Sequence, residues 1–429
     1  MDCLKRVKVI DVPTTATNMK VLVVCQHYWP EPFSVNDICE SLVKLGNQVV
    51  VVTGNPNYPE GKIYSGYKNE PFNIEEINGV EVRRVKIIPR GCDLKGIHKV
   101  QRVLNYLSFP INASKKYIVN NFDYDVVLCF QFSPILMAIP GIFFSRIKNV
   151  PFIIYCYDLW PEDLLTGGFK RKSAPFKIMK KISKRIYKKA NAIAVTSPGF
   201  IPYLTNYNEV QNVRFSFIPQ YAEDCFAKQP ERFTGAENIG DVNIVFAGNI
   251  GGNQNIENVV KAVSLLDPES RIRVHVYGSG SHLNKCISMK ELLKVDKIVF
   301  HGRLPFADMP KIYNKSDALL LSLSGGSDSL VPMLTFPRKL QTYLAAGKPV
   351  ICCADGDVGD YIRDNECGLA SASDNPEELC ATLKKFEMLT NDQKYKMSVN
   401  SFNCYGKYFN KDTVIAELDK LLKEEVGDG

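Results

Sequence analysis

The chain has 429 residues, of which 45% are hydrophobic and 23% charged, and its formal net charge is +7. This composition is that of a soluble globular protein, which excludes fibrous and intrinsically disordered chains, and the length allows about three domains. The thirteen cysteines are an odd number with no C-x-x-C pair, and several fall inside apolar runs. They indicate reduced, buried thiols and a cytoplasmic protein rather than a disulfide framework or a metal site.

The N-terminus shows no apolar stretch of the kind that a secretory signal needs. We expect residues 1–18 to be a leader ahead of the first strand, with Met19 as an alternative start. Residues 126–144, VVLCFQFSPILMAIPGIFF, are apolar enough to suggest a membrane span. Polar residues and prolines interrupt them, so a buried strand followed by a buried helix is the better prediction.

Short runs rich in β-branched residues alternate with segments of helical length along the first half of the chain. Such alternation predicts a parallel sheet wrapped by helices. The expected strands are 20–25, 48–53, 80–88, 125–130, 151–156 and 192–197, with 214–221 closing this half.

The same pattern restarts after a polar stretch at residues 226–241, which predicts a linker between two doubly wound domains. A helical tail follows from about residue 375. The strands expected in the second half are 242–248, 271–280, 296–304, 317–323 and 348–353.

Residues 170–189, KRKSAPFKIMKKISKRIYKK, contain ten Lys or Arg and no acid. Apolar residues recur there at helical spacing, which predicts a basic amphipathic helix suited to an anionic membrane surface. The alternative is a solvated helix with one face on the core. Nucleic acid is a weaker candidate partner, because no helix-turn-helix, RNA-binding or zinc-finger pattern is present. The candidate membrane residues are Lys180, Lys181, Lys184 and Arg185.

Residues 334–353, LTFPRKLQTYLAAGKPVICC, predict a helix followed by a buried strand. Pro337 suits the first helical position, and Gly347 suits the end of the helix. Arg338 and Lys339 add positive charge at the amide end, where cations are unfavourable by a few tenths of a kcal/mol, up to about 1. The pattern favours an anion in front of the helix, and the alternative is a pair of solvated surface cations.

Several longer motifs follow one another in a recognisable order. They are VLVVCQHYWPEP (21–32), YDLWPED (157–163), FAGNIGGNQNIENVVKAV (246–263), VYGSGS (276–281), FHGRLPFADMPKIYNKSDALLLSL (300–323) and FPRKLQTYLAAGKPVICCADGDVGDYI (336–362). In order and spacing they resemble the retaining family-4 glycosyltransferases over nearly the whole chain from about residue 19. The likeness is greatest to the bacterial fucosaminyltransferase type, which builds O-antigen or capsule repeat units on a lipid carrier.

This resemblance implies an α/β protein of the GT-B fold, with two facing doubly wound, Rossmann-like domains and a C-terminal helix that crosses back to the first domain. It implies a leader (1–18), an acceptor-binding domain (19–225), a linker (226–241), a nucleotide-sugar-binding domain (242–395) and a helical tail (396–429). The implied reaction moves an N-acetylated deoxyhexose such as N-acetylfucosamine from a UDP-linked donor to a polyprenyl-diphosphate-linked sugar, with retention. Such an enzyme works on the cytoplasmic face of the plasma membrane as a peripheral protein.

The same resemblance assigns site residues. The anion in front of Pro337 would be the donor diphosphate, and the candidate catalytic residues are Lys339, Asp158 and Glu162. For the two carboxylates, the alternative is a helix-capping acid and an exposed acid on a surface turn. For the Gly-Ser-Gly of VYGSGS, the alternative is a tight turn without a ligand. The nucleotide-sugar candidates are Gly248, Asn249, Gly251, Gln254, Ser279, Gly280, Arg303, Pro337, Arg338, Gln341 and Thr342. The acceptor candidates are His27, Glu31, Ser34 and Asn36.

Some positions depart from the wider family. Thr342 and Leu334 stand where most members carry a Glu-x7-Glu pair, and Asn249 and Gln254 replace a usual Arg and Lys. Arg338 and Lys339 then become the expected diphosphate clamp. Because the sequence shows no convincing Asp-x-Asp motif or histidine cluster of metal-ligand type, we expect transfer without a metal or other cofactor.

Three other classes of protein fit the sequence less well. A nicotinamide dehydrogenase needs G-x-G-x-x-G after its first strand, and CQHYWPEP has no glycine. A periplasmic binding protein should carry a signal peptide. A nucleotide-sugar epimerase of the same two-domain fold is the nearest alternative, although the basic helix would then lack a purpose.

Overall fold

In the computed structural model, the residues described are 19–91, 98–231, 240–325 and 329–427. The predicted leader and residues 232–239 of the predicted linker lie outside them. Contacts divide the described residues into two compact units, one formed by those up to 129 with 139–151 and 426–427, and the other by those of 130–138 and 152–425. The domain boundaries expected from the sequence remain a prediction.

The first sheet has the strand order β3-β4-β2-β1-β5-β6-β7-β8. β1 pairs in parallel with β2 and β5, and β6 with β7 and β7 with β8 likewise. β3, which the sequence analysis missed, runs antiparallel to β4. The strands are β1 (Lys20–Val24), β2 (Gln48–Gly54), β3 (Phe72–Ile77), β4 (Val80–Val85), β5 (Val126–Gln131), β6 (Phe152–Cys156), β7 (Ala192–Val195) and β8 (Arg214–Phe217).

The second sheet is parallel throughout, with the order β11-β10-β9-β12-β13-β14. This is the doubly wound arrangement, in which the order of strand addition reverses between β9 and β12. Ligands bind at the carboxyl ends of the strands near that point. β14 was not predicted from the sequence. The strands are β9 (Val242–Ala247), β10 (Ile272–Tyr277), β11 (Ile298–Gly302), β12 (Ala318–Ser322), β13 (Val350–Cys353) and β14 (Gly368–Ser371).

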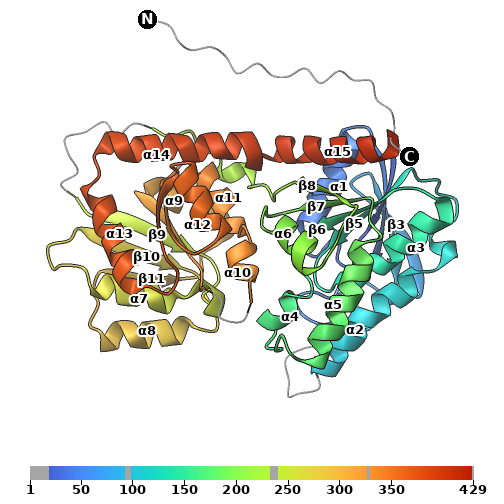
Figure 1. Cartoon of the computed structure of the whole chain (residues 1–429), viewed down its shortest axis with the longest axis horizontal. Coiled ribbons are helices and arrows are strands. Elements are labelled where there is room, and N and C mark those ends of the chain that lie inside the picture. Colours follow the sequence, from blue (N-terminus) through green and yellow to red (C-terminus); the bar gives the residue numbers. More distant parts are fainter. Residues whose placement is uncertain (1–18, 92–97, 232–239, 326–328, 428–429) are drawn as a thin grey trace, which may run out of the picture. The chain divides into compact units, whose positions relative to one another are not determined.

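Helices cover both faces of this second sheet (Figure 1). Neighbouring residues of β12 enter different cores, because Leu319 packs with Leu340 and Tyr343 while Leu320 packs with Val259 and Leu383. This alternation explains why the parallel strands read as continuous apolar runs.

The main helices are α1 (Ser34–Lys44), α2 (His98–Ala113), α3 (Ile139–Lys148), α4 (Asp163–Thr166), α5 (Ala174–Tyr187), α6 (Phe200–Pro202), α7 (Ile256–Ser264), α8 (Leu283–Leu292), α9 (Met309–Lys315), α10 (Val331–Leu334), α11 (Arg338–Ala345), α12 (Asp357–Asp364), α13 (Pro376–Met388), α14 (Asn391–Cys404) and α15 (Lys411–Gly427). The last three form the predicted helical tail. At the end of α15, Glu424 and Glu425 pair with Arg214 of β8, the second pair at 3.5 Å.

The apolar stretch 126–144 forms β5, a short 3-10 turn (Ile135–Ala138) and the start of α3, as predicted. Within the described ranges, the helices are all too short or too polar to span a bilayer. The described cysteines carry free thiols and, apart from Cys225, are buried.

Candidate functional site

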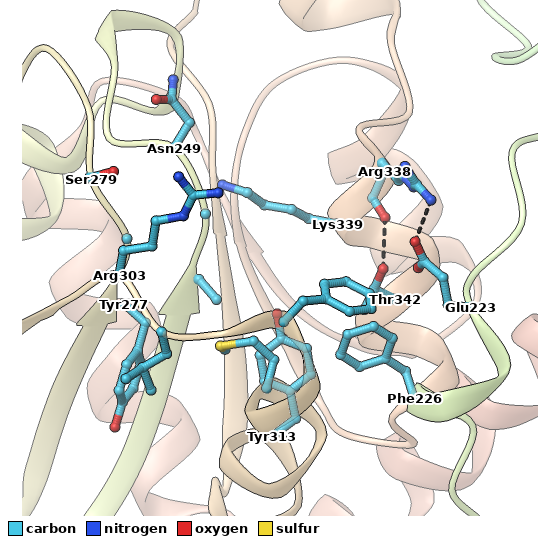
Figure 2. Close-up of a pocket in the computed structure, with 16 residues that line it drawn as sticks. Glu223, Phe226, Asn249, Tyr277, Ser279, Arg303, Tyr313, Arg338, Lys339 and Thr342 are labelled. Carbon is cyan, nitrogen blue, oxygen red and sulfur yellow. Dashed lines mark hydrogen bonds and ion pairs between the residues drawn. The ribbon is translucent and has the colours of Figure 1, made fainter. Parts of the chain in front are cut away.

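A cavity of about 510 Å³ lies in the second unit, where the loops after β9, β10 and β11 meet the start of α11. Its volume is within the range of small-molecule sites. Figure 2 shows the side chains that line it. They are Glu223, Phe226, Ala247, Gly248, Asn249, Tyr277, Gly278, Ser279, Arg303, Leu304, Phe306, Met309, Tyr313, Arg338, Lys339 and Thr342.

Two glycines let the strand ends approach each other. Gly248 has φ +137° and Gly278 has φ +147°, a region that L side chains rarely adopt. A Cβ at 278 would overlap the carbonyl oxygen of Gly248, and a Cβ at 248 would lie 2.8 Å from Nζ of Lys339. The loop after β9 is therefore open to a close backbone approach, and Lys339 occupies the space that a side chain would take.

Lys339 is the second residue of α11. Pro337 stands just before the helix with ψ 144°, so it is the N-cap and not the first helical residue that the sequence predicted. The Lys339 amine has no hydrogen-bond partner and lies 3.9 Å from the ring centroid of Phe246. Burial lowers the pKa of Lys339 from 10.5 to about 7. An anion would bind favourably beside an amine that is desolvated, lacks a hydrogen-bond partner and lies at a helix start.

The cations are arranged differently from the predicted pair. Arg338 forms an ion pair with Glu223, whereas Arg303 and Lys339 extend toward each other from opposite walls of the cavity (Figure 2). The sequence could not show this, because the partner of Arg338 lies 115 residues away in the chain. All three cations line the cavity, but the charge of Arg338 is already paired with Glu223.

One end of the cavity is apolar. The ring of Phe226 lies 5.2 Å from that of Phe306 and 5.4 Å from that of Tyr313. Tyr277 stacks on His301 at 4.4 Å. Sequence reasoning missed these rings: Phe226 was assigned to the linker, while Tyr277 could have been found from its place just before the glycines of VYGSGS.

The other nucleotide-sugar candidates divide into two groups. Asn249, Ser279 and Thr342 line the cavity, and the Thr342 hydroxyl donates to the carbonyl of Arg338 at 3.1 Å. The remaining candidates are not among the lining residues: Gly251, Gln254, Gly280, Pro337 and Gln341. Gln254 accepts from Asn249 at 3.4 Å, and the buried Gln341 amide turns back toward the carbonyls of Pro337 and Arg338. Gln254 and Gln341 therefore interact with neighbouring residues of their own segments.

Asp158 and Glu162 follow β6, but their surroundings differ. Burial, with a smaller contribution from the negative charge of Asp163, raises the pKa of Asp158 from 3.8 to about 7. Glu162 is fully buried and pairs with Arg171. It also accepts hydrogen bonds from the Tyr203 hydroxyl (2.8 Å) and the Leu330 amide (2.9 Å). Asp158 therefore has a carboxyl group with a perturbed pKa, which is common at reactive sites, whereas Glu162 is held by three partners.

The acceptor candidates cluster after β1. Nδ1 of His27 lies 2.9 Å from Glu31, whose other oxygen accepts from the amides of Asn57 (2.7 Å) and Tyr58 (2.6 Å). Asn36 donates to the Glu31 carbonyl at 2.8 Å, and Ser34 begins α1. His27, Glu31 and Asn36 are all buried. These hydrogen bonds join the loop after β1 to the start of α1, and Glu31 orients the imidazole.

The predicted basic helix is α5, and some of its cations interact with other side chains of the protein. Lys184 pairs with Glu209, and the amine of Lys180 lies 3.6 Å from the ring centroid of Tyr207. The sequence count of cations without acids therefore overstated the free charge, because Glu209 comes from a different element. Lys181 and Arg185 are exposed.

No group of three or more His, Cys, Asp or Glu side chains suited to a metal ion occurs within the described ranges.

Two family descriptions match the chain. Residues 33–220 match the glycosyl transferase 4-like domain, and residues 227–400 match the glycosyl transferases group 1. Together they cover most of the chain. The chain is also similar to WcaI of Escherichia coli strain K12, which is described as a colanic acid biosynthesis glycosyl transferase. The two are 22% identical over 361 residues, which are 79% of this chain and 84% of that relative.

Solved structures share the architecture at low identity. The sucrose-phosphate synthase of Thermosynechococcus elongatus has a TM-score of 0.68 at 14% identity, covering 96% of this chain and all of that one. HepE of Anabaena, solved in complex with UDP, has a TM-score of 0.65 at 12% identity, covering 95% of this chain and all of that one. With the two largely parallel α/β sheets described above, these likenesses confirm the GT-B fold.

Proposed function

The chain is a glycosyltransferase of the GT-B fold, built from a glycosyl transferase 4-like domain and a group 1 domain, and we propose that its donor is a nucleoside diphosphate sugar whose diphosphate lies between Arg303 and Lys339. The unpaired amine of Lys339 is the observation that carries this proposal. A buried amine without a partner is unfavourable in the free protein, and an anion supplies the missing interaction.

The chemistry of the proposed step follows from the same geometry. Glycosyl transfer breaks the bond between the sugar and the diphosphate, so negative charge grows on the leaving oxygen. Lys339, Arg303 and the first amides of α11 stabilise that charge, and they are already in place before the reaction begins. These groups need no metal for this task, and we propose transfer that is independent of metal and proceeds with retention.

We propose UDP as the nucleotide. HepE, one of the structural neighbours, was solved with UDP, which supports this choice without extending it to the sugar. The resemblance of the motifs to fucosaminyltransferases supports an N-acetylated deoxyhexose such as N-acetylfucosamine. The proposed acceptor is a polyprenyl-diphosphate-linked sugar of a bacterial surface polysaccharide, and the similarity to WcaI supports that setting.

Asp158 is the proposed residue that contacts a reacting hydroxyl. A carboxyl group with a pKa near 7 exchanges a proton readily at physiological pH. The loop of His27 and Glu31 is proposed to bind the acceptor, since its imidazole is held in one orientation by a carboxylate. Glu162 is proposed to position this region rather than to react.

A peripheral location on the cytoplasmic face of the plasma membrane is part of this proposal. The exposed cations of α5 are its support: Lys181 and Arg185, together with the partly engaged Lys180 and Lys184. Such attraction is screened beyond roughly 10 Å at 0.1 M salt. Changing these four residues to Glu should weaken binding of the protein to anionic vesicles in low salt and leave UDP binding intact. Sedimentation of the variant with vesicles as well as the parent would contradict this part.

Thermal shift against UDP, GDP and their sugars tests the donor. A ligand at a hundred times its dissociation constant adds about 2.7 kcal/mol of stability. Stabilisation by UDP is expected, and stabilisation by GDP alone would contradict the choice of nucleotide. Activity lost in chelator and restored by Mn²⁺ or Mg²⁺, or a product of inverted configuration by NMR, would contradict the mechanism. Interconversion of the free nucleotide sugar without acceptor would indicate an epimerase instead.

A further inference from the structure

Helix α2, cyan in Figure 1, has an exposed apolar stripe. Val100 is 64% exposed, Val103 54% and Ile111 66%, and Leu104 and Leu107 are above 40%. Their spacing is that of the buried face of an amphipathic helix, yet here this face points to solvent. Over residues 100–111 the stripe is roughly 16 Å long, at about 1.5 Å per residue.

The opposite face of α2 packs on its own unit through the buried Phe109 and Ala113 and through polar side chains. Asn105 is fully buried, accepts from Gln26 Nε2 at 2.9 Å and donates to the Ile88 carbonyl at 2.6 Å. The Ser108 hydroxyl accepts from the Ile88 amide at 2.9 Å, and Asn112 donates to the Lys86 carbonyl at 2.8 Å. Turning the helix to bury the stripe would leave these groups unpaired, at a cost of about 1–3 kcal/mol for each buried group. The outward orientation is therefore specified by hydrogen bonds.

The charged residues from α2 through the 3-10 turn after it (Lys116–Val119) are all basic. They are Lys99, Arg102, Lys115 and Lys116, and the nearest acid after them in the chain is Asp123. Tyr117, in the turn that follows α2, is 44% exposed. An apolar face with flanking cations and tyrosine is the combination found in helices that lie in the interface of an anionic bilayer.

We propose that the apolar face of α2 inserts into the headgroup and acyl boundary of an anionic phospholipid membrane. The charge pattern favours this occupant over a second copy of the chain, because two such cationic faces would repel each other. This inference rests on the proposal that the enzyme works at a membrane, and it adds the element that enters the apolar layer. The cations of α5 give a salt-sensitive attraction, whereas insertion of α2 gives a contribution that salt does not screen.

The test compares two matched variants of the full chain. Leu104→Gln with Leu107→Gln changes the stripe, and Leu292→Gln with Leu293→Gln makes the same change at two exposed leucines at the end of α8. Binding to mixed phosphatidylcholine and phosphatidylglycerol vesicles is measured by sedimentation at roughly 1 M salt, where the Debye length is about 3 Å. The α2 variant is expected to partition at least about tenfold more weakly than the parent, a difference of about 1.4 kcal/mol. The α8 variant should match the parent.

A second measurement reports depth. In a Leu104→Trp variant, vesicles are expected to shift the emission of the introduced tryptophan to the blue, and lipids brominated on their acyl chains should quench it; the parent, which has two tryptophans, gives the background. The inference is overturned if the parent does not bind at high salt or if the α2 variant binds as the parent does. It is also overturned if, without lipid, a parent dimer becomes a monomer in the α2 variant, since the stripe would then be a dimer interface.

Thermal shift by UDP without vesicles separates this inference from the proposed function. Loss of vesicle binding in the α2 variant with an unchanged UDP response supports both. Absence of a UDP response in the parent contradicts the proposed donor, and vesicle binding at high salt still decides whether α2 inserts.

Discussion

Lys339 passes so close to Gly248 that a Cβ at position 248 would lie 2.8 Å from its amine and closer still to the carbon before it. The glycine after β9 and the lysine at the start of α11 therefore depend on each other. The amine reaches its unpaired position beside Phe246 only because residue 248 has no side chain.

Gly248→Ala should displace Lys339 and weaken UDP binding. The loss should be about 1.5–3 kcal/mol, the range for hydrogen bonds to charged groups. Combining it with Lys339→Ala should add little, because both changes remove the same interaction. Gly66→Ala is the control: Gly66 also has a positive φ, of +88°, but a Cβ there would meet nothing within 4 Å. Calorimetry with UDP checks this, and equal affinity in Gly248→Ala and the parent would contradict it.

UDP affinity should fall as pH rises above 7. Burial lowers the pKa of free Lys339 to about 7, so above that pH the amine is largely neutral, whereas a bound diphosphate favours its charged form. Binding at pH 8 to 9 should therefore take up about one proton, and affinity should fall by up to about tenfold per pH unit. Calorimetry in buffers of different ionisation heats measures this proton uptake. If Lys339→Met still takes up a proton when it binds UDP, the proton belongs to another group.

The lowered pKa of Lys339 also predicts that the stability of the free protein rises with pH, whereas its UDP affinity falls. Lys339 binds its proton less readily in the folded protein than in the unfolded chain, so its penalty is full below pH 7 and is relieved between pH 7 and about 10.5. Lys339→Met should accordingly raise the melting temperature of the free protein most at pH 6. An equal change at pH 6 and pH 10 would argue against the burial of a charge.

Glu223→Gln should strengthen UDP binding. Glu223 lies in the cavity wall and pairs with Arg338, and its removal leaves Arg338 free to face the diphosphate. Because Arg338 is largely exposed, the gain should be modest, about 0.5–1 kcal/mol. Arg338→Ala should likewise cost less affinity than Arg303→Ala. Weaker UDP binding in Glu223→Gln would contradict this, because it would show that Glu223 orients Arg338 toward the diphosphate and does not compete with it.

Asp158 should control the pH dependence of transfer. Its raised pKa, of about 7, means that the ionised form grows between pH 6 and 8, and turnover should rise with it if the carboxylate accepts a proton. Asp163→Asn removes the neighbouring negative charge, so the rise in turnover should occur at lower pH. Asp158→Asn should lower turnover with UDP affinity intact, whereas Glu162→Gln should chiefly lower stability. A pH profile that does not move in Asp163→Asn would contradict the role of Asp158.

The sequence predicted most of the fold because parallel strands buried on both faces appear as short apolar runs. It missed β3 and β14, since FNIEEI is half exposed and GLAS is short and weakly apolar. The cavity residues that were predicted came from the resemblance of the motifs, and the helix start pointed separately to Arg338 and Lys339. The predicted cavity residues are Gly248, Asn249, Ser279, Arg303, Arg338, Lys339 and Thr342.

The rest depended on packing between distant segments. Glu223 and Phe226 reach the cavity from a segment without a local signal, and the pairing of Arg338 could not be read from its neighbours. The outward stripe of α2 also lies beyond sequence rules, because spacing identifies an apolar face without showing what it faces. Here the buried hydrogen bonds of Asn105 decide its direction.

The central claim is that the Lys339 amine holds the donor diphosphate. Its most direct test is calorimetric titration of UDP at pH 7 into the parent and into Lys339→Ala, with Lys285→Ala, an exposed lysine on α8, as the control. The account predicts that UDP binding is weaker by about 1.5–3 kcal/mol in Lys339→Ala and unchanged in Lys285→Ala. Equal affinity for UDP in Lys339→Ala and the parent would contradict it.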